Sequence, residues 1–365
     1  MVPRQRAGSG QAIKPDRDLV IDLARFFCLA LVVASHTMMV SPVLHPDGTV
    51  TSDNTLGNQR WFEPVVWVLQ VMPLFFVVGG ITGLQSWRRL RARGGRTSDF
   101  MQARMLRLIR PAAVLLAIMF SGLWAARLAG VDAQVIQLLV FGAGTPLWFL
   151  AAYLSAQLNL PMLARLHARA PWLTLLGLTS LVVAVDCLRG MMPTLAYLNM
   201  VFLWCAVQQL GFFLADGGPR ALGRTALAGI ILASNLVLGL LVWLGLYSGN
   251  MLVNLNPPNL TLLLLGISQA AALQLFRPVL SGIASLVRVR RFIGLAGLRS
   301  MTVYLWHLPL LAAMSGVLML TGFPQPAGGT AAPAQATRFP TARAGRAAVR
   351  RPARCRGAAG SGWAD

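Results

Sequence analysis

The chain has 365 residues, of which 56% are hydrophobic and only 12% are charged. Soluble domains carry about 25% charged residues, so this composition excludes an ordinary soluble domain and indicates a helical membrane protein. The formal net charge of +21 does not indicate nucleic-acid binding, because the arginines lie between apolar segments and no basic-aromatic recognition module is present. The four cysteines define no disulfide framework, since three of them lie in apolar stretches.

The first hydrophobic segment, Leu19 to Val40, is long enough to cross a bilayer as a helix and carries three ionisable side chains. Asp22, Arg25 and His36 are spaced so that all three lie on one stripe of a helix, with His36 about 16 Å beyond Arg25. Charged groups in lipid are costly, so we expect the stripe to face a protein-lined or hydrated cavity. The alternative is that Asp22 and Arg25 snorkel at the membrane edge while His36 is a structural hydrogen-bonding residue.

Hydropathy predicts an all-α polytopic membrane protein with about nine transmembrane helices. The predicted spans are approximately 19–40, 64–86, 111–128, 146–164, 172–188, 197–215, 226–247, 259–276 and 301–321. We therefore expect a basic cytoplasmic N-terminal segment (1–18), a transmembrane domain (19–321) and a tail (322–365).

Lysine and arginine are distributed unequally among the connections between these spans. With the N-terminus in the cytoplasm, the cytoplasmic connections hold 21 of them, and the outer connections up to residue 300 hold three. Positive residues favour the cytoplasmic side. We therefore predict a multi-pass protein of the cell membrane, with the N-terminus and the 88–110 loop inside and an irregular 41–63 loop outside.

The tail from residue 322 is rich in Ala, Gly, Pro and Arg, with seven arginines and no apolar periodicity. Such a composition cannot bury a core, so we predict a disordered tail. A second interpretation is a frameshift, because these four residues have GC-rich codons and a GC-rich gene read in the wrong frame would encode them.

Glycines are concentrated in the second span, which reads VMPLFFVVGGITGL. Gly79, Gly80 and Gly83 permit another backbone to approach closely, and Pro73 weakens the local hydrogen-bond ladder. Ordinary helix packing explains the glycines equally well.

Three arginines recur at every third residue before the third span: Arg104, Arg107 and Arg110. Guanidinium groups match phosphate oxygens geometrically, so the row is a candidate site for a polyphosphorylated ligand. The alternative is that these arginines bind anionic lipid headgroups.

Two later stretches also carry polar aromatic residues. His307 lies inside the ninth span, next to Trp306 and before Pro309, and Trp148 lies in the segment TPLWFLAAYL. An imidazole within the membrane favours a functional site, whereas interfacial aromatics usually only fix helix depth. No metal-binding spacing, phosphate-binding glycine loop or GxSxG motif is present.

Taken together, these stretches resemble the acyltransferase 3 family of integral membrane O-acyltransferases. The resemblance rests on Ile21-Asp22 with Arg25 and His36, on Pro73 to Gly80, on Arg107 and Arg110, on Leu147 to Leu150, and on Tyr304 to Pro309. Gly79 stands where the family has a serine. The family usually has ten spans, so nine spans followed by this tail favour the frameshift interpretation, with the tenth helix lost.

The resemblance implies transfer of an acyl group, usually acetyl, from cytoplasmic acyl-CoA to a hydroxyl of a cell-surface or lipid-linked glycan or glycosylated metabolite. A hydroxyl needs a base to remove its proton, and histidine suits this role near neutral pH. We assign His36 as the base, with Asp22 compensating the charge of Arg25.

The resemblance also implies that Arg25, Arg104, Arg107 and Arg110 are candidates to bind the CoA phosphates. His307, Tyr304 and Trp148 are then expected to line the substrate cavity. No metal and no permanently bound cofactor is implied.

Two other functions stay open. A transporter or flippase would use the same His and Arg side chains as a proton relay or substrate site, but the inverted repeats common in transporters are not visible. A truncated, inactive acyltransferase is the other. The sequence gives no indication of the acceptor, the acyl chain length or the oligomeric state.

Overall fold

The computed structural model describes residues 18–44, 50–54, 59, 61–131, 133–218 and 222–320. Apart from Asp18, the predicted N-terminal segment lies outside the described residues, as does the predicted tail from residue 322. The predictions made for these two segments therefore stay predictions.

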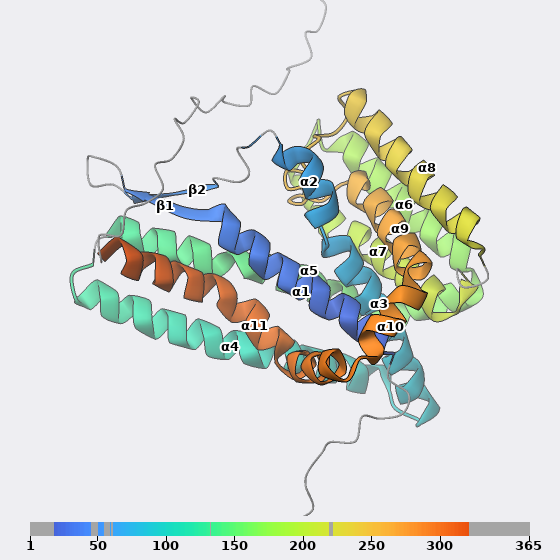
Figure 1. The fold of residues 1–365 in the computed structure, drawn as a ribbon, viewed down its shortest axis with the longest axis horizontal. Coiled ribbons are helices and arrows are strands. Elements are labelled where there is room, and N and C mark those ends of the chain that lie inside the picture. Colours follow the sequence, from blue (N-terminus) through green and yellow to red (C-terminus); the bar gives the residue numbers. More distant parts are fainter. Residues whose placement is uncertain are drawn as a thin grey trace, which may run out of the picture. The chain divides into compact units, whose positions relative to one another are not determined.

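The described residues form helices and one small hairpin (Figure 1). In chain order they are α1 (Leu19–Met39), β1 (Val40–Leu44), β2 (Val50–Asn54), α2 (Phe62–Leu69), α3 (Met72–Ala92), α4 (Thr97–Leu128), α5 (Ala133–Arg169), α6 (Pro171–Leu188), the 3-10 helix η1 (Pro193–Leu198), α7 (Asn199–Ala215), α8 (Arg224–Trp243), α9 (Leu260–Leu275), α10 (Arg277–Ser285) and α11 (Val287–Leu320). The helices coincide with the predicted spans, while several boundaries differ.

Three differences from the predicted elements have physical causes. β1 and β2 pair antiparallel, with Val40 opposite Asn54, in a loop predicted to be irregular, and valine and threonine favour this conformation. The second predicted span is interrupted at Gln70 and Val71, and α3 begins with Pro73 in its first turn. α4 and α11 begin about fourteen residues before the predicted spans, because arginine is a good helix former and extends both helices beyond their apolar parts.

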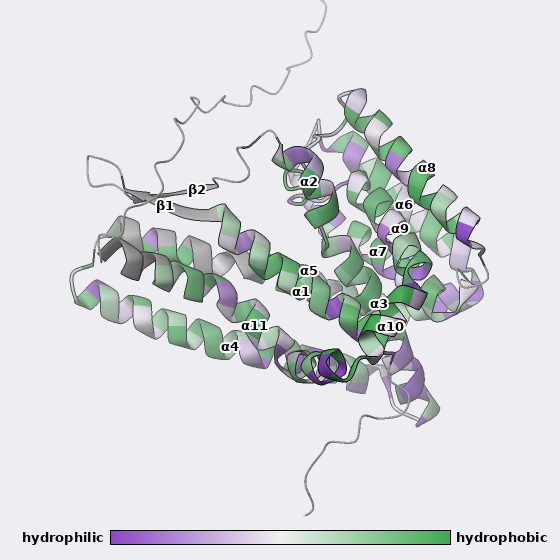
Figure 2. Ribbon diagram, viewed as in Figure 1, coloured by the Kyte–Doolittle hydropathy of each residue, from purple (hydrophilic) through white to green (hydrophobic). Residues whose placement is uncertain are grey.

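Among the described residues, seven segments are long and apolar enough to cross a membrane, and the pair α9–α10, bent by 61°, is a candidate eighth. The ninth predicted span, in α11, is not among them, so the number nine stays a prediction. Hydrophobic residues run along most of the length of these helices (Figure 2). Many large apolar side chains on them are exposed: Phe120 on α4 is 70% exposed and Trp243 on α8 is 80% exposed. Such faces need lipid around them, which identifies a multi-pass membrane protein.

The helices α3 and α7 cross at very short range and form the centre of the core. Phe76 stacks on Trp204 with ring centroids 4.2 Å apart. A Cβ atom on Gly80 would lie 2.2 Å from the backbone oxygen of Gln208, and one on Gly211 would lie 2.1 Å from the backbone oxygen of Val77. The predicted close backbone approach is therefore confirmed at Gly80.

The helices α1 and α11 pack side by side and run in the same direction (Figure 1). Phe26 meets Phe292 near the beginning of the contact, with ring centroids 5.0 Å apart. His36 meets His307 further along both helices, at 5.1 Å. Two parallel helices cross a membrane in the same sense, so residues at matching heights on α1 and α11 lie at the same depth.

The glycine crossing gives the first prediction. Gly80→Ala is expected to destabilise the protein by about 1–3 kcal/mol or more, because the added methyl group overlaps the backbone of α7. The matched control is Gly229→Ala on α8, where an added Cβ meets no atom within 4 Å. The thermal unfolding midpoint of each variant in detergent measures the effect. Equal midpoints for the two variants would show that the crossing does not limit stability.

Candidate functional site

Two imidazole rings, from α1 and α11, meet at the end of the α1–α11 contact. His36 Nδ1 donates to the backbone oxygen of Val32 at 2.8 Å, and His307 Nδ1 donates to that of Tyr304 at 2.5 Å. A carbonyl only accepts, so each neutral ring carries its proton on Nδ1 and keeps a lone pair on Nε2. His307 Nε2 is buried and has no hydrogen-bond partner among the described residues. Both rings are therefore able to accept a proton at Nε2.

A cavity of about 180 Å³ lies beside these two rings. Its walls come from α1, α2, the start of α3, α5, α11 and the connection between α8 and α9. The predicted residues His36, His307, Tyr304 and Trp148 all line it. The structure therefore brings together residues from three segments that are far apart in the sequence.

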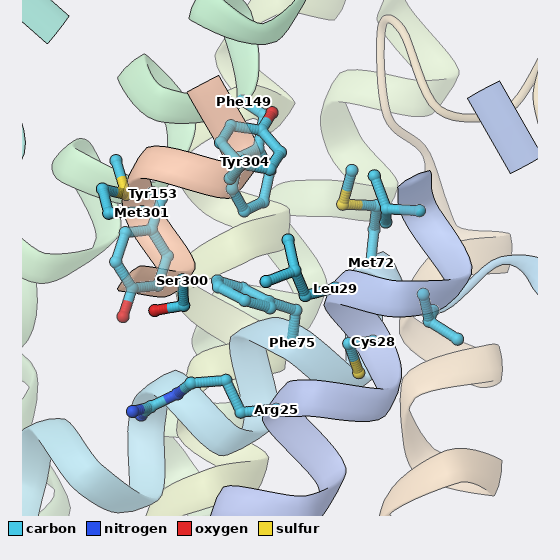
Figure 3. A pocket seen from close by; sticks show the side chains of 12 residues that line it. Arg25, Cys28, Leu29, Met72, Phe75, Phe149, Tyr153, Ser300, Met301 and Tyr304 are labelled. Carbon is cyan, nitrogen blue, oxygen red and sulfur yellow. The ribbon is translucent and has the colours of Figure 1, made fainter. Parts of the chain in front are cut away.

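A second, smaller cavity of about 50 Å³ continues towards the beginning of α1. It shares four lining residues with the larger cavity (Val32, Val71, Met72 and Tyr304), so the two cavities adjoin. Figure 3 shows Arg25 at one end of the smaller cavity, with the hydroxyls of Tyr153 and Ser300 directed to that side. The Phe149 and Tyr304 rings, 4.9 Å apart, form much of the remaining wall. Together the cavities extend from Arg25 to His36.

The predicted arginines are not equivalent in the structure. Arg25 donates to the Thr82 hydroxyl on α3 at 2.9 Å. Arg104 is half-buried and lies within electrostatic range of Arg25 and Tyr153. Arg107 and Arg110 are exposed, and none of the three arginines of the row lines a cavity. The structure thus places Arg104 nearer the protein interior than Arg107 and Arg110, and only Arg25 in the wall of a cavity.

Asp22 is half-buried on α1 and lines neither cavity. The ion pair predicted between Asp22 and Arg25 stays a prediction. At the foot of α1 it is Asp18 that forms an ion pair, with Arg277 of α10. This contact ties the beginning of the first helix to the bend after α9.

Sequence reasoning missed four polar residues of the cavities: Ser35, Gln70, Tyr153 and Ser300. Each lies within or beside an apolar run, which is a weak signal because buried polar residues also stabilise helix contacts. Gln157 is such a case, since it donates to Gln208 at 2.9 Å between α5 and α7.

Gly79 lies where the resemblance described above predicts a serine, and Tyr153 packs directly against it. A Cβ atom on Gly79 would lie 2.9 Å from Tyr153 Cε2 and 3.3 Å from the phenol oxygen. The Tyr153 ring therefore takes the space that a side chain at position 79 would need, and it supplies a hydroxyl near that position.

A separate polar cluster ties α3, α5 and α7 together away from both cavities. Asp216 accepts from Arg88 at 2.5 Å and from His167 Nε2 at 3.1 Å, and Gln209 donates to His167 Nδ1 at 2.6 Å. Partial burial raises the pKa of Asp216, but the hydrogen bonds and charges of Arg88 and His167 outweigh it and hold the pKa below its ordinary value. The cluster's residues are already paired with one another, which marks it as structural.

Comparison with known proteins identifies the domain. A family model described as an acyltransferase domain matches residues 18–337. The matched range includes every residue of the two cavities and the first part of the predicted tail. No curated protein and no solved structure matches the chain.

Proposed function

The chain belongs to the acyltransferase 3 family, and on this basis we propose that it transfers an acyl group, normally acetyl, from acyl-CoA in the cytoplasm to a hydroxyl of a cell-surface or lipid-linked glycan or glycosylated metabolite. The observation that carries the proposal is the pair of adjoining cavities, which extend from Arg25 to His36 and His307. The Arg25 end offers positive charge for the phosphates of CoA, and the other end offers the imidazoles of His36 and His307 as proton acceptors for the acceptor hydroxyl.

In this proposal His36 is the general base. Its Nε2 lone pair accepts the proton of the acceptor hydroxyl while the hydroxyl oxygen attacks the carbonyl carbon of the thioester. The carbon–sulfur bond then breaks, and the imidazolium of His36 returns the proton to the CoA sulfur. An ester and free CoA result. His307 lies beside the reacting groups and lines the acceptor end of the cavity.

The donor enters from the side of Arg25 and Arg104, where guanidinium groups bind its phosphates. The rise of α1 from Arg25 to His36 is about 16 Å, a length that the pantetheine arm of CoA can span. The volume of the smaller cavity, about 50 Å³, is less than that of this arm, so donor binding requires the cavity to widen. With the N-terminus in the cytoplasm of the cell, the phosphates stay inside and the acceptor approaches from outside.

His36→Gln tests the assignment of the base. Gln keeps a hydrogen-bonding side chain but cannot take up the proton, so the rate should fall more than about tenfold, a barrier increase above about 1.4 kcal/mol. The assay is release of CoA from radiolabelled acetyl-CoA by inverted membrane vesicles, which enclose the native glycans, scaled to the amount of inserted protein.

The matched control is His167→Gln, which removes a buried imidazole outside both cavities. It should lower the thermal unfolding midpoint and leave the rate per folded molecule close to that of the wild type. If His36→Gln retains more than about a tenth of the wild-type rate, His36 is not the base. His307 would then be the remaining imidazole of the cavity to test.

Arginine substitutions test donor binding. Arg104→Gln should raise the KM for acetyl-CoA about tenfold, the value of one charge-assisted hydrogen bond, with little change in kcat. Arg110→Gln should have a smaller effect, because Arg110 is exposed. Arg104→Lys should restore part of the affinity, since an ammonium cannot form the bidentate contact.

The control for this series is Arg89→Gln, an exposed arginine on α3 at the same basic connection. It should leave the KM for acetyl-CoA unchanged. An equal increase in KM for Arg89→Gln and Arg104→Gln would mean that the arginines act only through the surface potential or the lipid headgroups.

A further inference from the structure

A glutamine at the interruption between α2 and α3 reaches the cavity that holds the two imidazoles. Gln70 follows the last residue of α2, and its backbone is not helical. It is only 5% exposed and lines the larger cavity together with His36 and His307. A buried polar side chain in an apolar setting is stable only when its hydrogen-bonding groups are used.

The orientation of the Gln70 amide follows from its neighbours. The backbone N–H of Met72 donates to Gln70 Oε1 at 3.4 Å, and a backbone N–H has no acceptor atom, so the oxygen and not the nitrogen faces Met72. Gln269 of α9 holds the same segment. Its Nε2 donates to the backbone oxygen of Gln70 at 2.7 Å, and its Oε1 accepts from Leu74 at 2.9 Å. The Gln70 NH2 group therefore has a defined position.

That NH2 group is buried and has no partner within the described part of the chain. An unused buried donor costs about 1–3 kcal/mol. The two imidazoles of the same cavity offer acceptors only, because both Nδ1 protons are held by backbone carbonyls. The residues that line the cavity thus include proton acceptors for a hydroxyl and one buried donor, Gln70 Nε2, without a partner in the described part of the chain.

We propose that Gln70 is a catalytic residue that donates a hydrogen bond from Nε2 to the oxygen anion formed when the acceptor hydroxyl adds to the thioester carbonyl. This inference rests on the proposed acyl transfer. The new carbon–oxygen bond pushes the carbonyl electron pair onto oxygen, where Gln70 stabilises it. The pair then reforms the carbonyl as the carbon–sulfur bond breaks, and the sulfur takes the proton from His36. A fixed donor in a site with little water is well suited to this role.

Gln70→Met is the variant that tests the proposal, because methionine preserves the volume and removes the donor. We expect kcat to fall about 10²- to 10³-fold, with the KM for acetyl-CoA changed by less than about twofold. The thermal unfolding midpoint should change little, because the substitution removes the unpaired NH2 group but also the acceptor of the Met72 N–H. If Gln70 only stabilised the fold, Gln70→Met would clearly lower the midpoint and leave kcat normal.

The matched control is Gln157→Met, a buried glutamine outside both cavities that bonds Gln208. It should lower the midpoint and keep the rate per folded molecule. If Gln70→Met fails to insert into membranes, Gln70→Glu replaces it. Glutamate keeps an oxygen for the Met72 N–H but has no NH2 group, and it should be equally inactive at neutral pH.

Both variants are measured as CoA release from acetyl-CoA in inverted vesicles, beside the wild type and His36→Gln. If the wild type is active, His36→Gln is inactive and Gln70→Met stays within about tenfold of the wild-type kcat, the Gln70 assignment is wrong and the proposed function stands. An increase in KM with an unchanged kcat also overturns the Gln70 assignment, since Gln70 would then bind a substrate and not the anion. If the wild type releases no CoA, the proposed function and this assignment both fall.

Discussion

The parallel packing of α1 against α11 determines which groups of these two helices line the cavities. Because both helices run in the same direction, the turn of α1 that carries Arg25 and Phe26 meets Phe292, and the turn that carries His36 meets His307. In each histidine the main chain one turn earlier accepts the Nδ1 proton, which leaves Nε2 for chemistry. A shift of either helix by one turn would displace one ring from the other by about a further 5 Å along the helix axis and divide the site.

The rest of the helices hold this pair in place. α3 crosses α7 so closely at Gly80 that no side chain fits between them, and this rigid contact supports the first turn of α3. That turn is also fixed by Gln269 through two hydrogen bonds. Several contacts therefore hold the interruption before α3 in place, and Gln70 within it lies in the wall of the larger cavity. The unpaired NH2 group of Gln70 lowers the stability of the folded protein, and the packing of the surrounding core compensates for this loss.

Much of the fold followed from the sequence, because apolar length and helical period are local properties. The first span was predicted at 19–40 and α1 is Leu19–Met39. The Arg25–His36 spacing correctly placed both residues along one lined path.

The sequence did not predict which arginines of the row face the protein interior. Each step of three residues turns a helix by about 300°, so the direction of the side chains changes by about 120° from Arg104 to Arg110. Arg110 therefore lies on the surface. The break at Gln70 depends on Gln269, a contact across 199 residues that no local pattern reveals.

The central claim is that the acyl group passes from the Arg25 end of the cavities to the His36 end, and so from one side of the membrane to the other. The most direct measurement supplies radiolabelled acetyl-CoA to the outside of sealed inverted vesicles, which is the cytoplasmic face, and then adds an esterase that cannot cross the membrane. The account predicts a labelled ester that resists the esterase until detergent opens the vesicles. A labelled product that the esterase removes from intact vesicles would contradict it.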